Sequence, residues 1–323
     1  MNDALILAFT ALMGLSILLY VILDGYDLGV GMLMAAASDE EQATMVNSIG
    51  PFWDANETWL VLGVGLLLVA FPAAHGLVLG ALYLPVAAML VGLMLRGVAF
   101  ELRVKAEGWH RELWNWLFWA GSFLASFAQG LMLGRYITGF APGFGDWLFS
   151  IAVAGGVCGG YVLLGATWLV LKSEGGLQRK SIAWAKWGLI WVALAVALVS
   201  IATPVASETV RHKWFSFPLI LFLSPLPLLS LLAGVLLYRN LGRSDWKPFA
   251  CAVAIYVLAF AGLAYSLFPY VIIDRMTIWE AAAHPSALKF LGTGIAIVLP
   301  FIAGYTIYVY RVFGGKAKTG PLY

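Results

Sequence analysis

Nine apolar stretches, each close to the length that crosses a lipid bilayer, constrain the fold of this chain more than any other feature. A helix advances about 1.5 Å per residue, so roughly 20 mostly apolar residues cross the hydrocarbon core. Inside lipid, a helix also satisfies its own backbone hydrogen bonds. The sequence therefore predicts nine transmembrane helices, at approximately residues 4–23, 55–74, 78–95, 114–134, 147–171, 185–204, 217–238, 248–272 and 287–310.

Composition excludes a soluble protein. Hydrophobic residues occupy 62% and charged residues 11% of the 323 positions, against about 45–50% and about 25% in soluble domains. The net charge of +2 does not indicate a basic surface that would bind nucleic acid. We expect an all-α polytopic membrane protein that forms one integral membrane domain over residues 1–323. No lysine or arginine precedes Arg96, so we expect the first apolar stretch to be a retained span and not a cleaved signal.

The distribution of basic residues predicts the orientation. Fourteen of the 19 lysines and arginines fall in the loops after the third, fifth and seventh spans and in the C-terminal tail. Loops rich in lysine and arginine stay in the cytoplasm. The sequence thus predicts a protein of the cytoplasmic membrane with its N-terminus outside and its C-terminus inside.

Strongly polar residues of the first three spans gather at one membrane face, the cytoplasmic one in this orientation. They occur in "LDGYDLGVGM", "WDANETW" and "MLRGVAFELRVK". Acids are costly in a membrane and mark proton paths. We therefore interpret four acids as a proton pathway and four neighbours as supporting hydrogen-bonding or ion-pairing groups. The acids are Asp24, Asp54, Glu57 and Glu101, and the supporting residues are Asp27, Asn56, Arg96 and Arg103.

A structural interpretation competes with this one. Acids in the first turn of a helix are stabilised by the helix dipole by about 0.3–1 kcal/mol. For Glu57 and Asp27 we favour that interpretation, with Arg96 or Arg103 neutralising the charge. Asp54 is expected to lie deeper in the membrane than a capping acid would, beside two tryptophans. For Asp54 both interpretations, proton pathway and helix capping, remain open. Upstream, Ser38 and Glu41 match a capping box that would open a short amphipathic helix over residues 39–47, on the membrane surface or against a partner.

No redox or metal centre is expected within this chain. Its four histidines, His75, His110, His212 and His284, fall in predicted loops or at span ends, whereas membrane-embedded haem needs axial ligands that face each other. There is no phosphate-binding loop and no spacing of residues typical of metal ligands. The glycines of "DGYDLGVG" favour close helix packing.

Two long motifs carry a family resemblance. "LDGYDLGVGML" and "NSIGPFWDANETWLVLG", together with "LRGVAFELR", "SLFPYVI" and the terminal "PLY", resemble subunit II of cytochrome bd-type quinol oxidases, the CydB family. The resemblance implies nine spans, arranged as two four-helix bundles plus one peripheral helix. It also implies a heterodimer with a related subunit I that carries two b-type haems and one haem d, oxidises quinol and reduces dioxygen to water. Subunit II is haem-free in that family.

The resemblance implies site residues and partners as well. The family's cytoplasmic proton route is attributed to acids that match Asp24 and Asp54, and Glu101 matches an acid after span three. Membrane lipid, quinone and a small accessory subunit are further partners that the sequence does not identify. Two other interpretations stay open: a passive scaffold for subunit I, and a proton-coupled secondary transporter. The transporter is disfavoured because the acids occupy one face and no matching halves occur.

Overall fold

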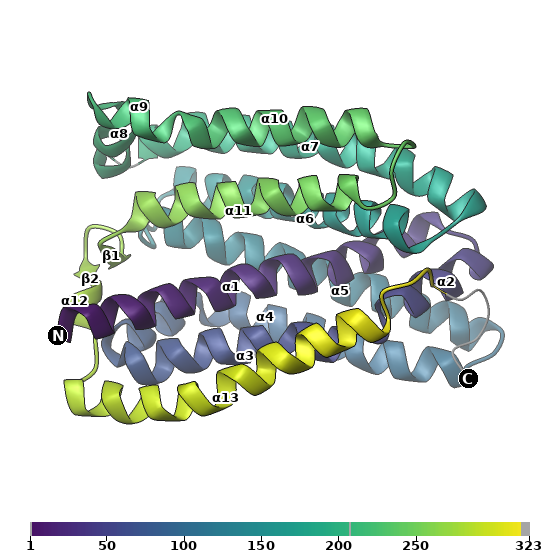
Figure 1. Ribbon diagram of the computed structural model, residues 1–323, viewed down its shortest axis with the longest axis horizontal. Coiled ribbons are helices and arrows are strands. Elements are labelled where there is room, and N and C mark those ends of the chain that lie inside the picture. Colours follow the sequence, from purple (N-terminus) through teal and green to yellow (C-terminus); the bar gives the residue numbers. More distant parts are fainter. Residues whose placement is uncertain (1, 207, 318–323) are drawn as a thin grey trace.

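The computed structural model describes residues 2–206 and 208–317, so the terminal "PLY" lies outside the described residues. Helices run nearly parallel along the long axis, with the N-terminus at one end and the last described residues at the other (Figure 1). The elements are α1 (Asn2–Leu33), η1 (Met34–Ala36), α2 (Asp39–Ile49), α3 (Trp53–Ala70), α4 (Pro72–Lys105), α5 (Trp109–Ile137), α6 (Phe144–Lys172), α7 (Gly175–Ala206), α8 (Glu208–Phe215), α9 (Leu219–Leu223), α10 (Pro225–Asn240), α11 (Lys247–Leu267), β1 (Tyr270–Ile272), β2 (Met276–Thr277), α12 (Ile278–Ala281) and α13 (Pro285–Val312).

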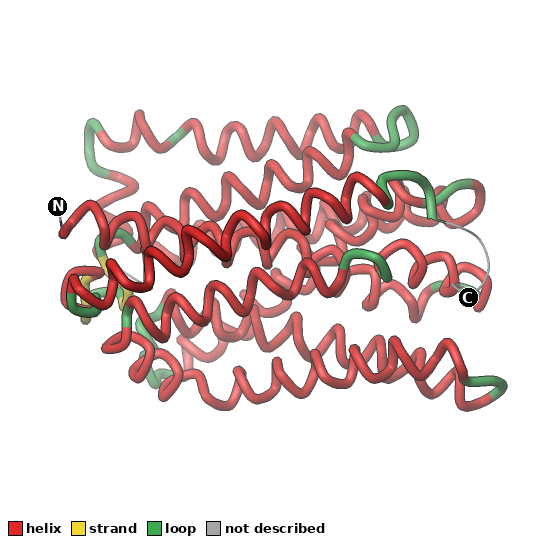
Figure 2. The backbone as a smooth tube through the Cα atoms, turned by 60° about the horizontal axis from the view of Figure 1, so that its bottom comes forward, coloured by secondary structure: helices red, strands yellow, loops and turns green. Residues whose placement is uncertain are grey.

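Eight helical segments of the described chain are long and apolar enough to cross a membrane, and a ninth is present if α2 and α3 form one bent span. The axes of α2 and α3 differ by 53°. Apart from one small antiparallel hairpin, β1–β2, the regular structure is helical (Figure 2). The prediction of an all-α polytopic membrane protein is confirmed, whereas the grouping into two four-helix bundles plus one helix stays a prediction.

The second and the eighth predicted span each run past the end of a helix, and proline explains both breaks. The second span was expected over 55–74, but α3 ends at Ala70 and Pro72 opens α4. Proline lacks the N–H that continues a helix but suits a first helical position. The eighth span was expected over 248–272, but α11 ends at Leu267 and Pro269 precedes strand β1. The residue before a proline is disfavoured in helical conformation.

The capping box at α2 is confirmed, but the helix does not stand alone at a surface. Ser38 N donates to Glu41 Oε2 at 2.8 Å, and the helix runs from Asp39 to Ile49. One face of α2, including Met45 and Val46, is buried. Trp168 of α6 donates its indole N–H to Ser48 O at 3.2 Å. Helix α2 therefore packs against α1 and α6 of the same chain.

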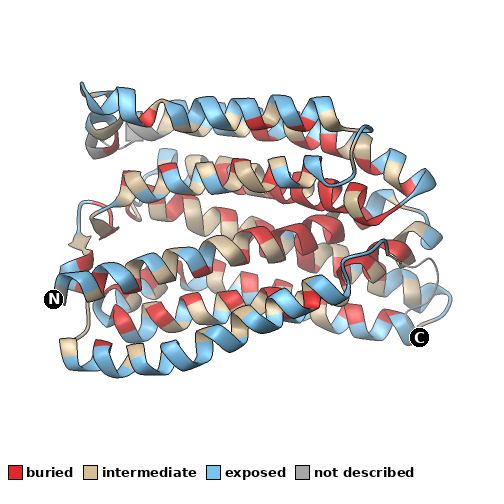
Figure 3. Cartoon of the chain, in the orientation of Figure 1, coloured by how far each residue is buried: buried red, intermediate tan, exposed pale blue. Residues whose placement is uncertain are grey.

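Helix α1 packs against three long helices, α3, α5 and α6. Residues 24–31 of α1 are all buried, whereas α13 and α10 are largely exposed on their outer faces, as expected for surfaces that meet lipid (Figure 3). Glycines allow the close approach of α1 and α6. A Cβ on Gly29 would lie 1.8 Å from the Tyr161 carbonyl oxygen, and one on Gly165 would lie 2.4 Å from Val30 N. The predicted packing role of the motif glycines is confirmed at Gly25, Gly29 and Gly31, whereas Gly165 on α6 was not predicted.

Gly29→Ala should therefore push α1 away from α6, because the added methyl group meets rigid backbone. Overpacking of this kind costs about 1–3 kcal/mol. We expect a lower temperature of irreversible inactivation for the purified complex. Gly65→Ala on α3 is the matched control, since a Cβ there meets nothing within 4 Å. Equal inactivation temperatures for the two variants would contradict the close-packing assignment.

Candidate functional site: a buried cluster of acids around Arg96

The guanidinium of Arg96 joins three helices through two carboxylates. Arg96 lies on α4 with 2% of its side chain exposed, and its Nη1 is 2.7 Å from Oδ1 of the fully buried Asp24 on α1. Its Nη2 donates to Glu57 Oε1 on α3. The contact with Asp24 is an ion pair, and among the described residues neither Asp24 oxygen nor Arg96 Nε has a hydrogen-bond partner. Glu57 is 33% exposed and forms the outer side of the cluster.

A hydrogen-bonded group of neutral side chains holds a third acid one turn further along α1. The buried Asp27 accepts from Asn56 Nδ2 at 2.7 Å through Oδ2, and its Oδ1 has no hydrogen-bond partner among the described residues. Asn56 Oδ1 accepts from the Tyr310 hydroxyl at 3.0 Å, and the hydroxyls of Tyr310 and Tyr26 lie 2.5 Å apart. Asp27 therefore has polar contacts but no cation of its own.

The charges of this cluster do not balance. Asp24, Asp27 and Glu57 are three carboxyl groups, and the one arginine beside them, Arg96, forms ion pairs with Asp24 and Glu57. Isolated buried charges are strongly unfavourable, and like charges that share a site disfavour full ionisation. The cluster therefore holds three acidic groups against one arginine in a site with little access to water. Carboxyl groups in such a site are the kind of group that can exchange protons.

The structure places the other predicted acids on the surface. Asp54 is exposed in the first turn of α3, so the expectation that it lies deeper than a capping acid is wrong. The reason is helical geometry. Asn56 faces α1, and Asp54, two positions earlier, points away from it, because residues two apart do not share a helix face. Glu101 is also exposed, five residues beyond Arg96 on α4.

Arg103 is buried but does not join the acids. Its Nε donates to Asn115 Oδ1 at 2.7 Å, and Asn115 Nδ2 donates to Gln42 Oε1 at 2.6 Å. Gln42 in turn donates to Met34 O at 3.1 Å. This chain of contacts joins α4, α5 and α2, so Arg103 supports the fold beside the site and does not neutralise the acids.

The chain matches the family model for cytochrome bd terminal oxidase subunit II over residues 5–313. The chain belongs to this family. It is therefore an integral inner-membrane protein and one subunit of a terminal oxidase complex, an oxidoreductase that contains haem. The designation as a second subunit implies a partner, subunit I.

Curated relatives agree over nearly the whole length. The cytochrome bd ubiquinol oxidase subunit 2 of Bacillus subtilis is 28% identical, with 91% of each chain covered. The cytochrome bd-I ubiquinol oxidase subunit 2 of Escherichia coli K12 is 27% identical, with 95% of this chain and 94% of that one covered. A chain of the solved bd oxidase of Geobacillus thermodenitrificans superposes with a TM-score of 0.79 at 17% identity, over 97% of this chain and 100% of that chain. At that identity the superposition shows a shared fold.

Two tyrosines of this subunit II site were not predicted. Tyr26 lies inside the motif "LDGYDLG", and its placement between two acids of one buried face was a usable signal. Tyr310 had no such signal. It lies 254 residues after Asn56 and reaches it because α13 packs along α3 (Figure 1).

Proposed function

We propose that this chain is the haem-free subunit II of a quinol-oxidising cytochrome bd complex and that it conducts protons from the cytoplasm toward the oxygen-reducing haem of subunit I. The observation that carries the proposal is the buried Asp24–Arg96–Glu57 cluster with Asp27 beside it. Both relatives are named as ubiquinol oxidase subunits. We therefore propose a quinol as the reductant of this complex.

The proposed route enters at the exposed acids and proceeds inward. Asp54 and Glu101 would collect protons at the surface, and the partly exposed Glu57 would pass them to the buried Asp24. The hydrogen-bonding capacity left on Asp24 and Arg96 supports exchange through water, since buried polar groups are otherwise paired. Asn56, Tyr26 and Tyr310 position Asp27 one turn nearer the cytoplasmic end of α1 than Asp24, and Arg103 supports the helices around it.

The haems are proposed to lie in subunit I, two of b type and one of d type. The histidines of this chain do not fit an axial pair: His75 lies in the first turn of α4, His110 opens α5, His212 lies in the short α8 and His284 caps α13. Bound haem would supply the electron transfer to dioxygen, and the part proposed for this chain is delivery of protons.

Purification through a tag on this chain should bring subunit I and an optical spectrum of b- and d-type haem. Single replacements of each of the four histidines by alanine should leave the haem content of the complex unchanged, because none is proposed as a ligand. A pyridine haemochrome assay measures this directly. Loss of one haem equivalent from an otherwise assembled variant would overturn the haem-free assignment.

The proposed orientation places the N-terminus outside. The loops after α4, α6 and α10 lie at the same end of the molecule as the last described residues (Figure 1). Cysteines introduced at Lys105, Arg179 and Arg243 should resist an impermeant thiol reagent in intact cells, while one at Gly145 should react. Labelling of the three basic loops from outside would show that the orientation is inverted.

The other interpretations make different predictions. A secondary transporter is not favoured, because the family is that of a terminal oxidase subunit. The passive-scaffold interpretation keeps the family and routes all protons through subunit I. In that case the buried acids would serve only the fold, and the replacement of Asp24 described below separates the two interpretations.

A further inference from the structure

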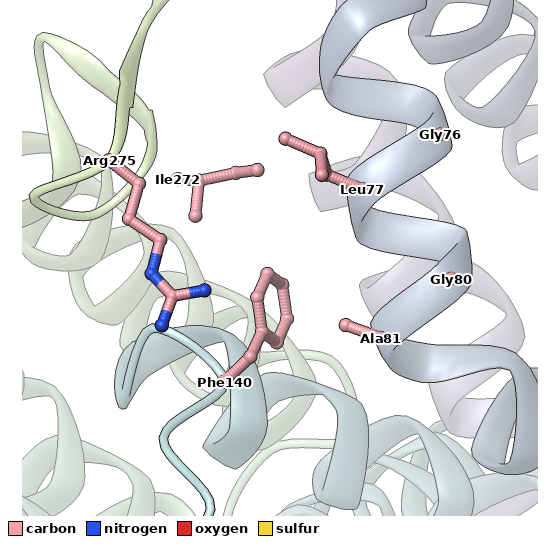
Figure 4. Close-up of a pocket in the computed structure, with 7 residues that line it drawn as sticks. All are labelled: Gly76, Leu77, Gly80, Ala81, Phe140, Ile272 and Arg275. Atoms are coloured by element: carbon pink, nitrogen blue, oxygen red, sulfur yellow. The ribbon is translucent and has the colours of Figure 1, made fainter.

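A cavity of about 320 Å³ opens at the end of the molecule that holds the N-terminus, far from the acid cluster (Figure 4). It lies between the first turns of α4, the loop after α5 and the β1–β2 hairpin. Its lining comprises Gly76, Leu77, Gly80, Ala81, Phe140, Ile272 and Arg275. The proposed proton route uses none of these residues, so the cavity needs a separate explanation.

Glycines keep the α4 side of the cavity open. Gly76 and Gly80 are four residues apart and share a helix face. A Cβ at either position would meet no atom within 4 Å, so neither glycine is required for helix packing. Glycine weakens a helix relative to alanine. Nearby Leu77 and Leu84 are exposed, as expected where α4 meets lipid. This side of the cavity is a shallow apolar surface that faces the membrane.

The opposite side is held in place by the backbone. Phe140 adopts a φ of 63°, in the left-handed region that bulky residues rarely occupy. Its N–H donates to Arg135 O at 2.9 Å, which fixes the loop. The Tyr136 hydroxyl donates to Val271 O and fastens the hairpin to α5. Such conformations persist where the surroundings enforce them, and they concentrate at ligand-binding positions. The Phe140 ring turns toward α4, so the cavity is already formed (Figure 4).

Arg275 is the charged residue of the lining. It follows Asp274, whose φ of 56° turns the hairpin, and its N–H donates to Ile272 O at 3.0 Å. The guanidinium extends past Ile272 to the edge of the Phe140 ring (Figure 4). Within residues 2–206 and 208–317 Arg275 has no ion-pair partner. A cation thus stands at the rim of an apolar cavity, at the level where the spans end.

We propose that this cavity binds one anionic glycerophospholipid, with an acyl chain along Gly76 and Gly80 and its phosphate at Arg275. The shallow apolar surface on the α4 side can bind a hydrocarbon chain. The Arg275 guanidinium can bind a phosphate through bidentate hydrogen bonds. A neutral quinone head would gain less from this cation. The site would fix the hairpin and the loop after α5 to the lipid around them.

The test uses the complete oxidase complex in nanodiscs that contain either phosphatidylglycerol or phosphatidylcholine with a photoreactive group on one acyl chain. Cross-linked peptides are then identified by mass spectrometry. Phosphatidylglycerol should label the peptide of α4 that carries Gly80 and the loop that carries Phe140. Arg275→Gln should lower this labelling about fivefold, the ratio expected for loss of one basic residue at a membrane surface. Phosphatidylcholine should label weakly in both proteins.

Two variants complete the experiment. Gly80→Leu should fill the cavity and remove labelling at Phe140 by either lipid. Lys289→Gln is the charge-matched control, because Lys289 is exposed at the same end of the molecule on α13. It should leave labelling unchanged. Equal labelling by the two lipids, no effect of Arg275→Gln, or no labelling at Phe140 in the parental complex would each overturn the proposal.

Discussion

Arg96→Met is expected to cost the fold about 3–5 kcal/mol, the usual effect of removing one partner of a buried ion pair. Arg96 is the shared cation of Asp24 and Glu57, and both it and Asp24 are almost completely buried. Methionine has a similar length but leaves two carboxyl groups without a counter-charge. The expected result is a much lower yield of assembled complex and a lower inactivation temperature. Size-exclusion chromatography of the tagged complex in detergent measures the yield, and residual quinol oxidase activity after stepwise heating gives the inactivation temperature.

Two further variants identify the cause of that loss. Arg239→Met removes an exposed arginine of α10 and should behave like the parent. The triple variant Arg96→Met, Asp24→Asn, Glu57→Gln removes the stranded charges and should recover most of the stability, since a buried ion pair replaced as a unit is often neutral. If Arg96→Met alone assembles with parental stability, the ion-pair assignment is wrong.

Asp24→Asn is expected to lower quinol oxidase turnover by about 100-fold or more, within the range typical of a lost proton-transfer group. Asparagine keeps the shape of the side chain but cannot exchange a proton. Arg96 retains Glu57 as a partner, so assembly and haem content should stay close to parental. Turnover with a quinol analogue, measured as oxygen consumption across pH, provides the readout.

Asp54→Asn is the comparison variant for Asp24→Asn, because the two aspartates differ in burial. Asp54 was expected to lie deeper than a capping acid, but it is exposed whereas Asp24 is fully buried. Solvent can replace an exposed carboxylate, so Asp54→Asn should now show the milder loss. An assembled Asp24→Asn complex with near-parental turnover at every pH would favour the scaffold interpretation over the proton route.

The sequence alone predicted the features that the lipid bilayer imposes on each segment of the chain. Lipid demands long apolar helices, and the chain shows them, so the fold class and most spans could be derived without coordinates. The Ser38–Glu41 capping box and the close-packing glycines also depend on short-range chemistry, and both were predicted. The errors fell at boundaries such as Ala70 and Leu267, where proline ends a helix within an apolar run.

Tertiary structure alone decided which polar groups meet. Arg96 pairs with Glu57 across 39 positions, and Tyr310 reaches Asn56 across 254 positions. Apolar runs specify that helices cross the membrane but not which helices are neighbours or how each is rotated about its axis. That rotation buried Asp24 and exposed Asp54, and the packing of the loops against α4 brought Arg275, Phe140 and Gly80 to one cavity. Hydrophobicity is a property of each segment, whereas the site is a property of how the segments pack.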